Sequence, residues 1–249
     1  MTLLTIARRE LEGFFYAPVA YVVGTLFLLL QGITFYLFTL VLSSPQAGPG
    51  AVFAVFFGGT LFYWVALVFL TAVVPMRLLA EERRAGTIEP LLTAAVSDLE
   101  VVVGKYLGAL GFFVAMWLPT LVYVALVRGL GGPIEPGPIA AGYLGTLLEG
   151  AALLGLGTLA SALARNQIVA AVLAFVLGFG LLLLGIVPVV ARGSLPPWLA
   201  SVFEFMSPWR QMQDFSRGIV DSRNVVFLLS VVVLSLFGAV RALEARRWT

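Results

Sequence analysis

The chain of 249 residues contains no cysteine and no histidine. Without cysteine there can be no disulfide bonds and no thiol chemistry. Without histidine the chain lacks the usual general base and the usual ligand of transition metals. Charge is scarce as well, because Asp, Glu, Lys and Arg together make up 11% of the residues. These absences argue against the common hydrolytic and metal-dependent active sites.

Two catalytic motifs are also missing. No segment matches G-x-x-x-x-G-K-[ST], the loop that holds nucleotide phosphates, so the chain cannot hydrolyse ATP by itself. The one lysine, Lys105, lies in "VGKYL" without the required upstream glycine or following hydroxyl. An intramembrane serine protease would need a histidine or a paired lysine near its serine, and no span offers one. We therefore expect no catalytic residue, no metal ligand and no cofactor bound by this chain.

What the sequence does contain is apolar. Hydrophobic residues make up 61% of it and the mean hydropathy is +1.04, whereas soluble domains are about 45–50% apolar. Six runs reach the roughly 20 residues that a helix needs to cross a bilayer. They cover residues 18–42, 52–79, 101–127, 139–163, 168–187 and 225–243. The prediction is an all-α integral membrane protein with six transmembrane helices in one domain, residues 1–249, and no cleavable signal peptide.

The distribution of positive charge predicts the orientation of the chain. If both termini are cytoplasmic, ten Lys and Arg residues lie inside. The outside set is then half as large: Arg128, Arg192, Arg210, Arg217 and Arg223. The positive-inside rule favours this arrangement, which places the charge-rich residues 77–100 in the cytoplasm.

Two segments outside the spans have amphipathic or aromatic character. Residues 1–17 combine apolar side chains with Arg8, Arg9, Glu10 and Glu12, which predicts a helix lying on the membrane surface. A simple extension of the first span is the alternative. Residues 188–224 are rich in aromatic residues, including Trp198. We expect them to form external re-entrant helices that dip into the membrane edge and pack against the bundle.

The charged segment between spans two and three shows signs of order. Gly86 is a typical helix stop, and Thr87 can cap a new helix with Glu89 in its first turn. "SDLE" at residues 97–100 is a capping box directly before the third span. We therefore predict a short cytoplasmic helix within residues 80–98. Its apolar positions are Ile88, Leu91, Leu92 and Val96. An ordinary solvated loop is the alternative.

Three stretches carry a resemblance to a known family. They are "MRLLAEERRAGTIEPLLT" at residues 76–93, "NQIVAAVLAF" at 166–175, and "DFSRGIVDSRNVVF" at 214–227 followed by "ALEARRW". In this order they resemble type-2 ABC transporter permeases, nearest to the gliding-motility-associated and nitrous-oxide-reductase-maturation permeases. The chain departs from that pattern at Pro90, where relatives are apolar, and at Ala95, where they have proline. These departures affect where the short helix is broken.

The resemblance implies a function and partners. Two six-span subunits, here a homodimer, would form the translocation path of an exporter in the bacterial inner membrane, above two separate ABC ATPase subunits that bind ATP and Mg. The short cytoplasmic helix would be the coupling helix that fits a groove on the ATPase. The implied polar contacts are Glu81, Glu82, Arg83, Arg84 and Glu89. A periplasmic auxiliary protein is a further candidate partner, and nucleic acid is not one.

Polar residues inside the spans are few. Glu149 lies well within the fourth span, where a carboxylate is costly and a candidate for function. It could line the translocation path or pair with Arg128; the alternative is a protonated or hydrogen-bonded packing residue. Gln31 in the first span is a weaker path candidate, and we expect an interhelical hydrogen bond there. Small residues of the fourth span, Ala151, Gly155, Gly157 and Ser161, favour close helix packing.

Two other functions remain open from sequence. A secondary transporter or channel would need no ATPase, but such proteins usually show several charged residues or broken helices at mid-membrane. A membrane anchor could instead use an ATPase to do mechanical work on a periplasmic partner. The substrate is not readable from the sequence.

Overall fold

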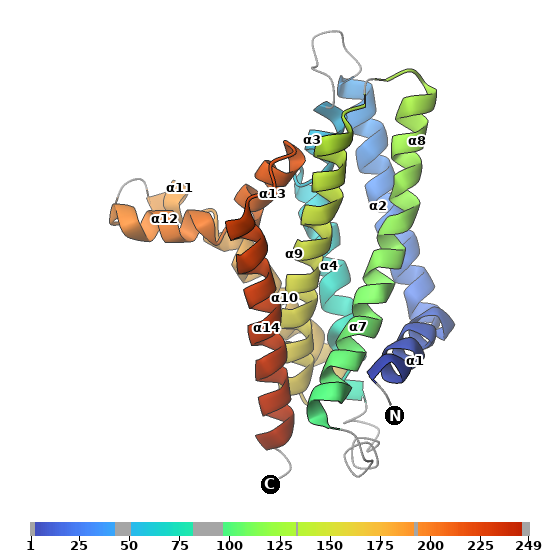
Figure 1. Ribbon diagram of the computed structural model, residues 1–249, viewed down its shortest axis with the longest axis vertical. Coiled ribbons are helices and arrows are strands. Elements are labelled where there is room, and N and C mark those ends of the chain that lie inside the picture. Colours follow the sequence, from blue (N-terminus) through green and yellow to red (C-terminus); the bar gives the residue numbers. More distant parts are fainter. Residues whose placement is uncertain (1–2, 43–50, 82–96, 133, 192–193, 246–249) are drawn as a thin grey trace.

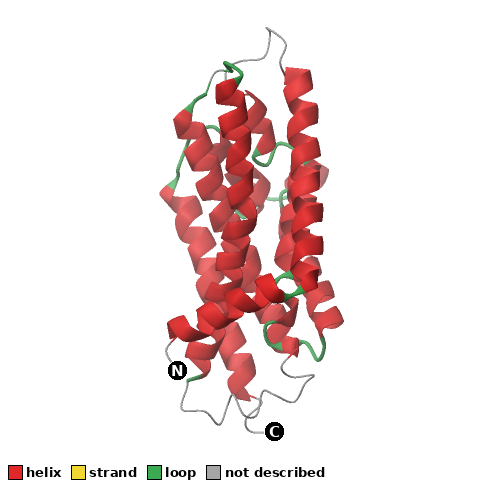
Figure 2. Ribbon diagram, turned by 90° about the vertical axis from the view of Figure 1, so that its right-hand side faces the viewer, coloured by secondary structure: helices red, strands yellow, loops and turns green. Residues whose placement is uncertain are grey.

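The computed structural model describes residues 3–42, 51–81, 97–132, 134–191 and 194–245. These residues are helical almost throughout and contain no strand. They form an elongated bundle of long helices that run roughly parallel to one another (Figures 1 and 2). The all-α prediction is confirmed for this part of the chain.

The long helices follow the predicted apolar runs. Five are long and apolar enough to cross a membrane: Pro18–Leu40, Asp98–Gly129, Pro136–Leu163, Gln167–Leu184 and Ser222–Glu244. In the labels of Figure 1 they correspond to α2 (Pro18–Leu42), α7 (Asp98–Trp117) continued by α8 (Leu121–Gly129), α9 (Pro136–Leu163), α10 (Gln167–Leu184) and α14 (Ser222–Glu244). The chain is therefore a multi-pass membrane protein.

The first and last described helices lie at the same end of the bundle. The N-terminal helix α1 (Leu3–Tyr16) and the end of α14 both lie at the lower end in Figure 1. We call this end the terminal end and the opposite one the far end. The separate helix predicted for residues 1–17 is present, because α1 ends at Tyr16 and α2 begins at Pro18. Its place on a membrane surface stays a prediction.

The second apolar run does not form the single span expected for residues 52–79. It is divided into α3 (Ala51–Phe56), α4 (Leu61–Val73) and the 3₁₀ turn η1 (Pro75–Arg77). Gly58 has a φ of 78°, a left-handed conformation that ends a helix and suits glycine. Thr60 then caps α4, its side chain accepting a hydrogen bond from the Tyr63 N–H at 3.2 Å. The apolar helix Leu61–Arg77 is consequently shorter than the five others.

The third and fourth spans begin earlier than predicted. The third starts at Asp98 rather than 101, and its course is interrupted by the 3₁₀ turn η2 (Leu118–Thr120), which contains Pro119. A proline inside a helix removes one backbone donor and bends the helix. The fourth starts at Pro136 rather than 139, because proline is well accommodated in a first turn.

The segment expected to be re-entrant contains three short helices. These are α11 (Val187–Ala191), α12 (Pro197–Phe205) and α13 (Pro208–Ser216). Helix α13 packs on α9 and buries Gln211, Met212 and Phe215. Helix α12 has no buried residue and projects sideways from the bundle. Its last residue, Phe205, packs edge-on against Phe227 of α14 with ring centroids 5.4 Å apart, so the expected packing against the bundle is seen only at this end of α12.

The centre of the bundle is α9, which contacts α4, α7, α10, α13 and α14. Its small residues make this possible. A Cβ atom added at Gly150 would lie 2.1 Å from the Phe113 ring, and one at Gly157 would lie 2.3 Å from Pro75. The close packing predicted for this helix is therefore confirmed at Gly157, and neighbouring aromatic rings fill the space that the glycines leave.

Candidate functional site at the terminal end of the bundle

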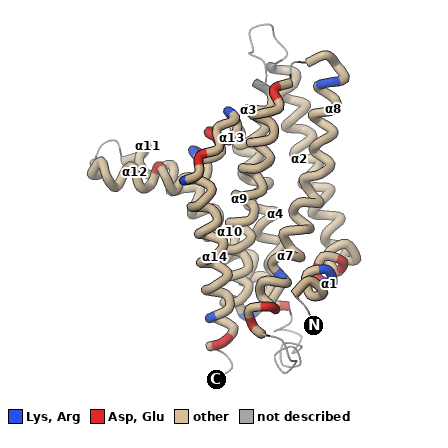
Figure 3. Tube along the Cα trace, viewed as in Figure 1, with Lys and Arg blue, Asp and Glu red and all other residues tan. Residues whose placement is uncertain are grey.

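Most of the predicted coupling residues fall outside the described part of the chain. This holds for Glu82, Arg83, Arg84, Thr87, Ile88, Glu89, Leu91 and Leu92. Glu81 and Ser97, the residues on either side of residues 82–96, are described, and both make side-chain contacts. Figure 3 shows charged residues gathered here, on α1, at the start of α7 and at the end of α14.

The end of the second span is held by one serine of α9. The Ser161 hydroxyl accepts hydrogen bonds from the backbone N–H groups of Leu79 and Ala80, both at 3.1 Å. It also donates to the Met76 carbonyl at 3.3 Å. Met76 and Leu79 lie beyond the end of α4, so the serine supplies hydrogen-bond partners that the helix no longer provides. The sequence suggested close packing for Ser161 but gave no sign of this anchoring role.

Arg77 connects the end of the second span to α1. Its guanidinium forms an ion pair with Glu81 at 3.1 Å. The guanidinium carbon also lies over the Phe14 ring of α1, 5.7 Å from its centroid. Phe14 in turn stacks on Phe112 of α7 at 5.0 Å. Glu81 therefore lies in a chain of contacts that reaches both α1 and α7.

The start of the third span carries the predicted capping box. The Glu100 N–H donates to the Ser97 hydroxyl at 3.3 Å, and the Ser97 N–H donates to the Glu100 carboxylate at 2.9 Å. Asp98 and Glu100 both lie in the first turn of α7, where negative charge interacts favourably with the helix dipole. The capping box is confirmed, and it fixes the point at which the charged segment enters the third span.

An ion pair connects α1 to the beginning of α7. The Lys105 ammonium lies 2.9 Å from the Glu10 carboxylate, and the two side chains are 6% and 21% exposed. Such shielding makes the pair costly to break, because removal of one partner leaves the other charge enclosed. From the sequence, Glu10 was one of the polar residues of a predicted surface helix, and its pairing with Lys105 was not predicted.

Helix α1 approaches α7 closely because α7 presents glycines to it. A Cβ atom added at Gly104 would lie 2.9 Å from Ile6, and one at Gly108 would lie 2.6 Å from Glu10. Gly104, Gly108 and Gly111 are spaced four and three residues apart, so they share one helix face. This spacing is a signal for close helix contact that the sequence contains, and it could have indicated the docking face.

Both ends of the charged segment are bound to α1. Arg77, where the second span ends, contacts Phe14, and Lys105, near the start of the third span, contacts Glu10. We call the segments that carry Arg77 and Lys105 the two arms; residues 82–96 connect them. A displacement of either arm would therefore be passed to α1, and through Ser161 to α9.

Glu149 lies at the middle of α9, about 20 Å from the helix start at Pro136. Its exposed fraction is 0%, and neither carboxylate oxygen has a hydrogen-bond partner among the described residues. Glu149 is thus enclosed by side chains of its own chain. Pairing with Arg128 is wrong, since Arg128 is exposed at the end of α8.

The surroundings of Glu149 are aromatic and hydroxylated. The Tyr63 and Thr146 hydroxyls are hydrogen-bonded at 2.9 Å, and Thr146 precedes Glu149 by three residues on α9. The Trp117 indole, whose ring centroid is 5.9 Å from that of Tyr63, is likewise buried without a hydrogen-bond partner in the described chain. These contacts place Glu149 in a core between α4, α7 and α9.

Gln31 is also enclosed, with 1% of its surface exposed. Neither atom of its amide finds a partner among the residues described, so the expected interhelical hydrogen bond is not present there. The assignment of Glu149 and Gln31 to a translocation path stays a prediction. Within the described ranges no group of three acidic side chains could hold a metal ion.

A family model described as an ABC-2 family transporter protein matches residues 44–242, which is well over half of the chain. No curated protein sequence matches. The matched range begins before α3 and ends within α14, so it includes both arms of the charged segment and leaves α1 outside.

Proposed function

The chain belongs to the ABC-2 family of transporter proteins, and from this premise we propose that it is the export permease of a bacterial inner-membrane transporter. The family assigns it the membrane-spanning part of an ABC transporter, not the ATPase. We propose that two copies form the translocation path and that each binds one separate ATPase subunit, which supplies ATP and Mg. Its place in the gliding-motility and nitrous-oxide-reductase-maturation branch stays a prediction from the quoted motifs.

A six-span topology with cytoplasmic termini supports this arrangement. The two described ends of the chain lie at one end of the bundle, which requires an even number of crossings. Five helices are long enough on their own, and in this proposal the shorter apolar helix Leu61–Arg77 is the sixth crossing. Its surroundings make a short helix acceptable, because most of α4 is buried in protein.

The proposed coupling step uses the two fixed arms. Residues 82–96, with apolar Ile88, Leu91 and Leu92 between charges, form a helix that inserts into a groove on the ATPase. Movement of the ATPase then displaces the arms that carry Arg77 and Lys105. The single observation that carries this proposal is that both arms are bound to α1, so that they move as one unit.

The test separates binding of the ATPase from insertion into the membrane. Glu89→Arg and Leu92→Asp should leave the permease in the membrane but lose the ATPase in a pull-down, together with its stimulated hydrolysis. Removal of one member of a shielded charge pair costs on the order of 2–5 kcal/mol, enough to weaken a subunit contact severely. Arg128→Ala, an exposed change at the far end, is the matched control. Full binding and hydrolysis by both variants would show that residues 82–96 are a solvated loop.

Glu149 can be tested separately. Glu149→Gln keeps the shape of the side chain and removes its ability to gain and lose a proton, in a site where neither carboxyl oxygen has a hydrogen-bond partner in the described chain. We expect unchanged expression and unchanged ATPase binding, with altered transport. Unaltered transport would assign Glu149 to packing alone.

Transport in sealed vesicles distinguishes the remaining alternative. A permease moves its substrate across the vesicle membrane when ATP is supplied, whereas a mechanical anchor hydrolyses ATP without transport. Co-purification with an ATPase excludes a secondary transporter.

A further inference from the structure

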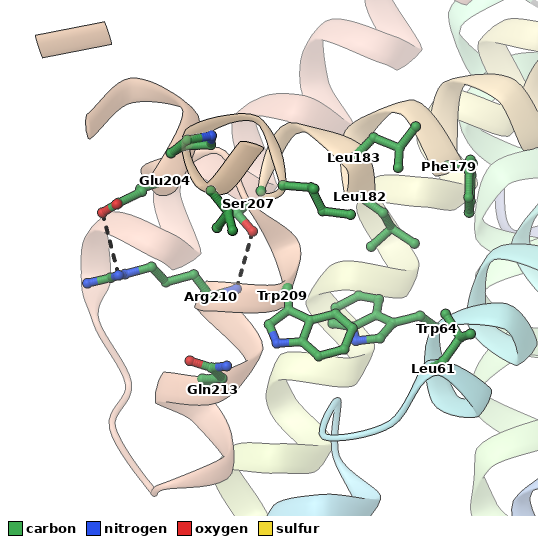
Figure 4. A pocket seen from close by; sticks show the side chains of 14 residues that line it. Leu61, Trp64, Phe179, Leu182, Leu183, Glu204, Ser207, Trp209, Arg210 and Gln213 are labelled. Carbon is green, nitrogen blue, oxygen red and sulfur yellow. Dashed lines mark hydrogen bonds and ion pairs between the residues drawn. The ribbon is translucent and has the colours of Figure 1, made fainter. Parts of the chain in front are cut away.

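A pocket of about 500 Å³ opens near the far end of the bundle, away from the coupling arms. It lies where the beginning of α4, the end of α10 and the helices α11 to α13 meet (Figure 4). Its size falls within the range of small-molecule sites, roughly 300–1,000 Å³. Residues of several helices line it, so it is a concave site and not a flat face.

Most of the wall is apolar. Leu182, Leu183 and Phe179 of α10 form one side, as Figure 4 shows. Opposite them Trp64 of α4 and Trp209 of α13 stack, with ring centroids 5.9 Å apart. The Trp64 indole N–H donates to the Gly58 carbonyl at 3.0 Å, so its polar atom is satisfied. Trp64 is 1% exposed and supports Trp209, whose ring supplies most of the accessible aromatic surface of the pair. An alkyl chain in this part of the pocket would contact only apolar side chains.

The polar groups gather on one side, where α12 meets α13. Arg210 and Glu204 form an ion pair at 3.5 Å, and their side chains are 65% and 49% exposed. Ser207 and Gln213 lie beside them. The pocket is therefore amphipathic: an apolar interior leads to a rim that offers one positive and one negative group close together.

We propose that this pocket binds one acyl chain of a zwitterionic phospholipid from the surrounding bilayer. The chain lies between the α10 side chains and the Trp64–Trp209 pair. The headgroup phosphate lies at Arg210, and the headgroup ammonium lies at Glu204. A headgroup with both charges replaces the exposed Arg210–Glu204 pair with two charge-assisted contacts and leaves neither side chain unpaired. Tryptophan at this level matches the interfacial belts of membrane proteins. The proposal does not depend on the transported substrate.

Native mass spectrometry of the full-length protein tests it. The protein is purified from vesicles that contain equal amounts of phosphatidylethanolamine and phosphatidylglycerol, and the retained lipids are counted. We expect about one phosphatidylethanolamine per chain. Leu183→Trp, which fills the pocket, should lower this occupancy about tenfold. Val176→Trp is the matched control, because Val176 lies two turns earlier on α10, is 57% exposed and does not line the pocket; it should retain the lipid.

The headgroup contacts are tested by a second pair of variants. Arg210→Ala should lower retention about fivefold, whereas Arg128→Ala, at the end of α8, should not. If Leu183→Trp does not fold, Val189→Trp, at an exposed lining position, replaces it. Retention by the plugged variant equal to the wild type overturns the site. Preferential retention of phosphatidylglycerol overturns the headgroup assignment, and a pocket occupied by a copurifying protein overturns both.

Discussion

The two ends of the bundle are built by different means. At the terminal end, separate helices are joined by side chains that are buried or nearly so: Lys105 with Glu10, and Ser161 with the backbone of Leu79 and Ala80. At the far end, α12 projects without a buried residue, and its ion pair between Glu204 and Arg210 is exposed. Shielded polar contacts hold their partners in one geometry, whereas exposed ion pairs contribute little to the stability of the fold.

This difference suggests a division of work between the ends. The terminal end is suited to transmit force, because a displacement of one arm is imposed on the helices bound to it. The far end is suited to adapt to its surroundings, because α12 has no buried residue and reaches the long helices through its last residue, Phe205, which contacts Phe227 of α14. Substitutions at the two ends should therefore change the stability of the protein by different amounts. Three substitutions measure that difference.

The largest effect is expected at Glu10. Glu10→Ala removes the carboxylate that lies 2.9 Å from the shielded Lys105 ammonium and should destabilise the protein by about 3 kcal/mol. The measurement is the midpoint of thermal unfolding in detergent, together with ATPase stimulation. Glu12→Ala on the same helix is the control, since the Arg8–Glu12 pair is exposed. The pair Glu10→Leu and Lys105→Met should recover stability, and equal loss in Glu10→Ala and Glu12→Ala would contradict the buried bridge.

A smaller loss is expected at Ser161. Ser161→Ala removes the acceptor for two buried backbone N–H groups and should cost about 1–3 kcal/mol. It should also increase hydrogen exchange at Leu79 and Ala80, which mass spectrometry can follow. Ser230→Ala is the matched control, because the Ser230 hydroxyl is exposed and bonds only to its own helix among the described contacts. Unchanged hydrogen exchange at both amides would show that another group holds the end of the second span in place.

The smallest effect is expected at the far end. Glu204→Ala removes an exposed partner of Arg210 and should change stability by less than about 1 kcal/mol. ATPase stimulation should stay at the wild-type level. A destabilisation as large as that of Glu10→Ala would remove the contrast between the two ends.

Hydropathy predicted most of the fold because a bilayer imposes both a length and an apolar composition on each span. Local chemistry predicted the capping box, since Ser97 and Glu100 are neighbours in sequence. The break at Gly58 was missed because a hydropathy average does not register a left-handed glycine followed by a capping threonine. The pair of Glu10 and Lys105 was missed because 95 positions separate its members, and only the packing of α1 on α7 brings them together.

The docking of α1 has a consequence for the order of events during synthesis. The face that receives α1 includes Gly104, Gly108 and Gly111, so it does not exist until more than 100 residues have left the ribosome. Until then Ile6, which packs on Gly104, and the face of Phe14 that stacks on Phe112 lack the surface that covers them. Helix α1 is therefore made before α7 but reaches its final place only after it. A nascent chain halted before residue 98 would carry α1 exposed to lipid or chaperones.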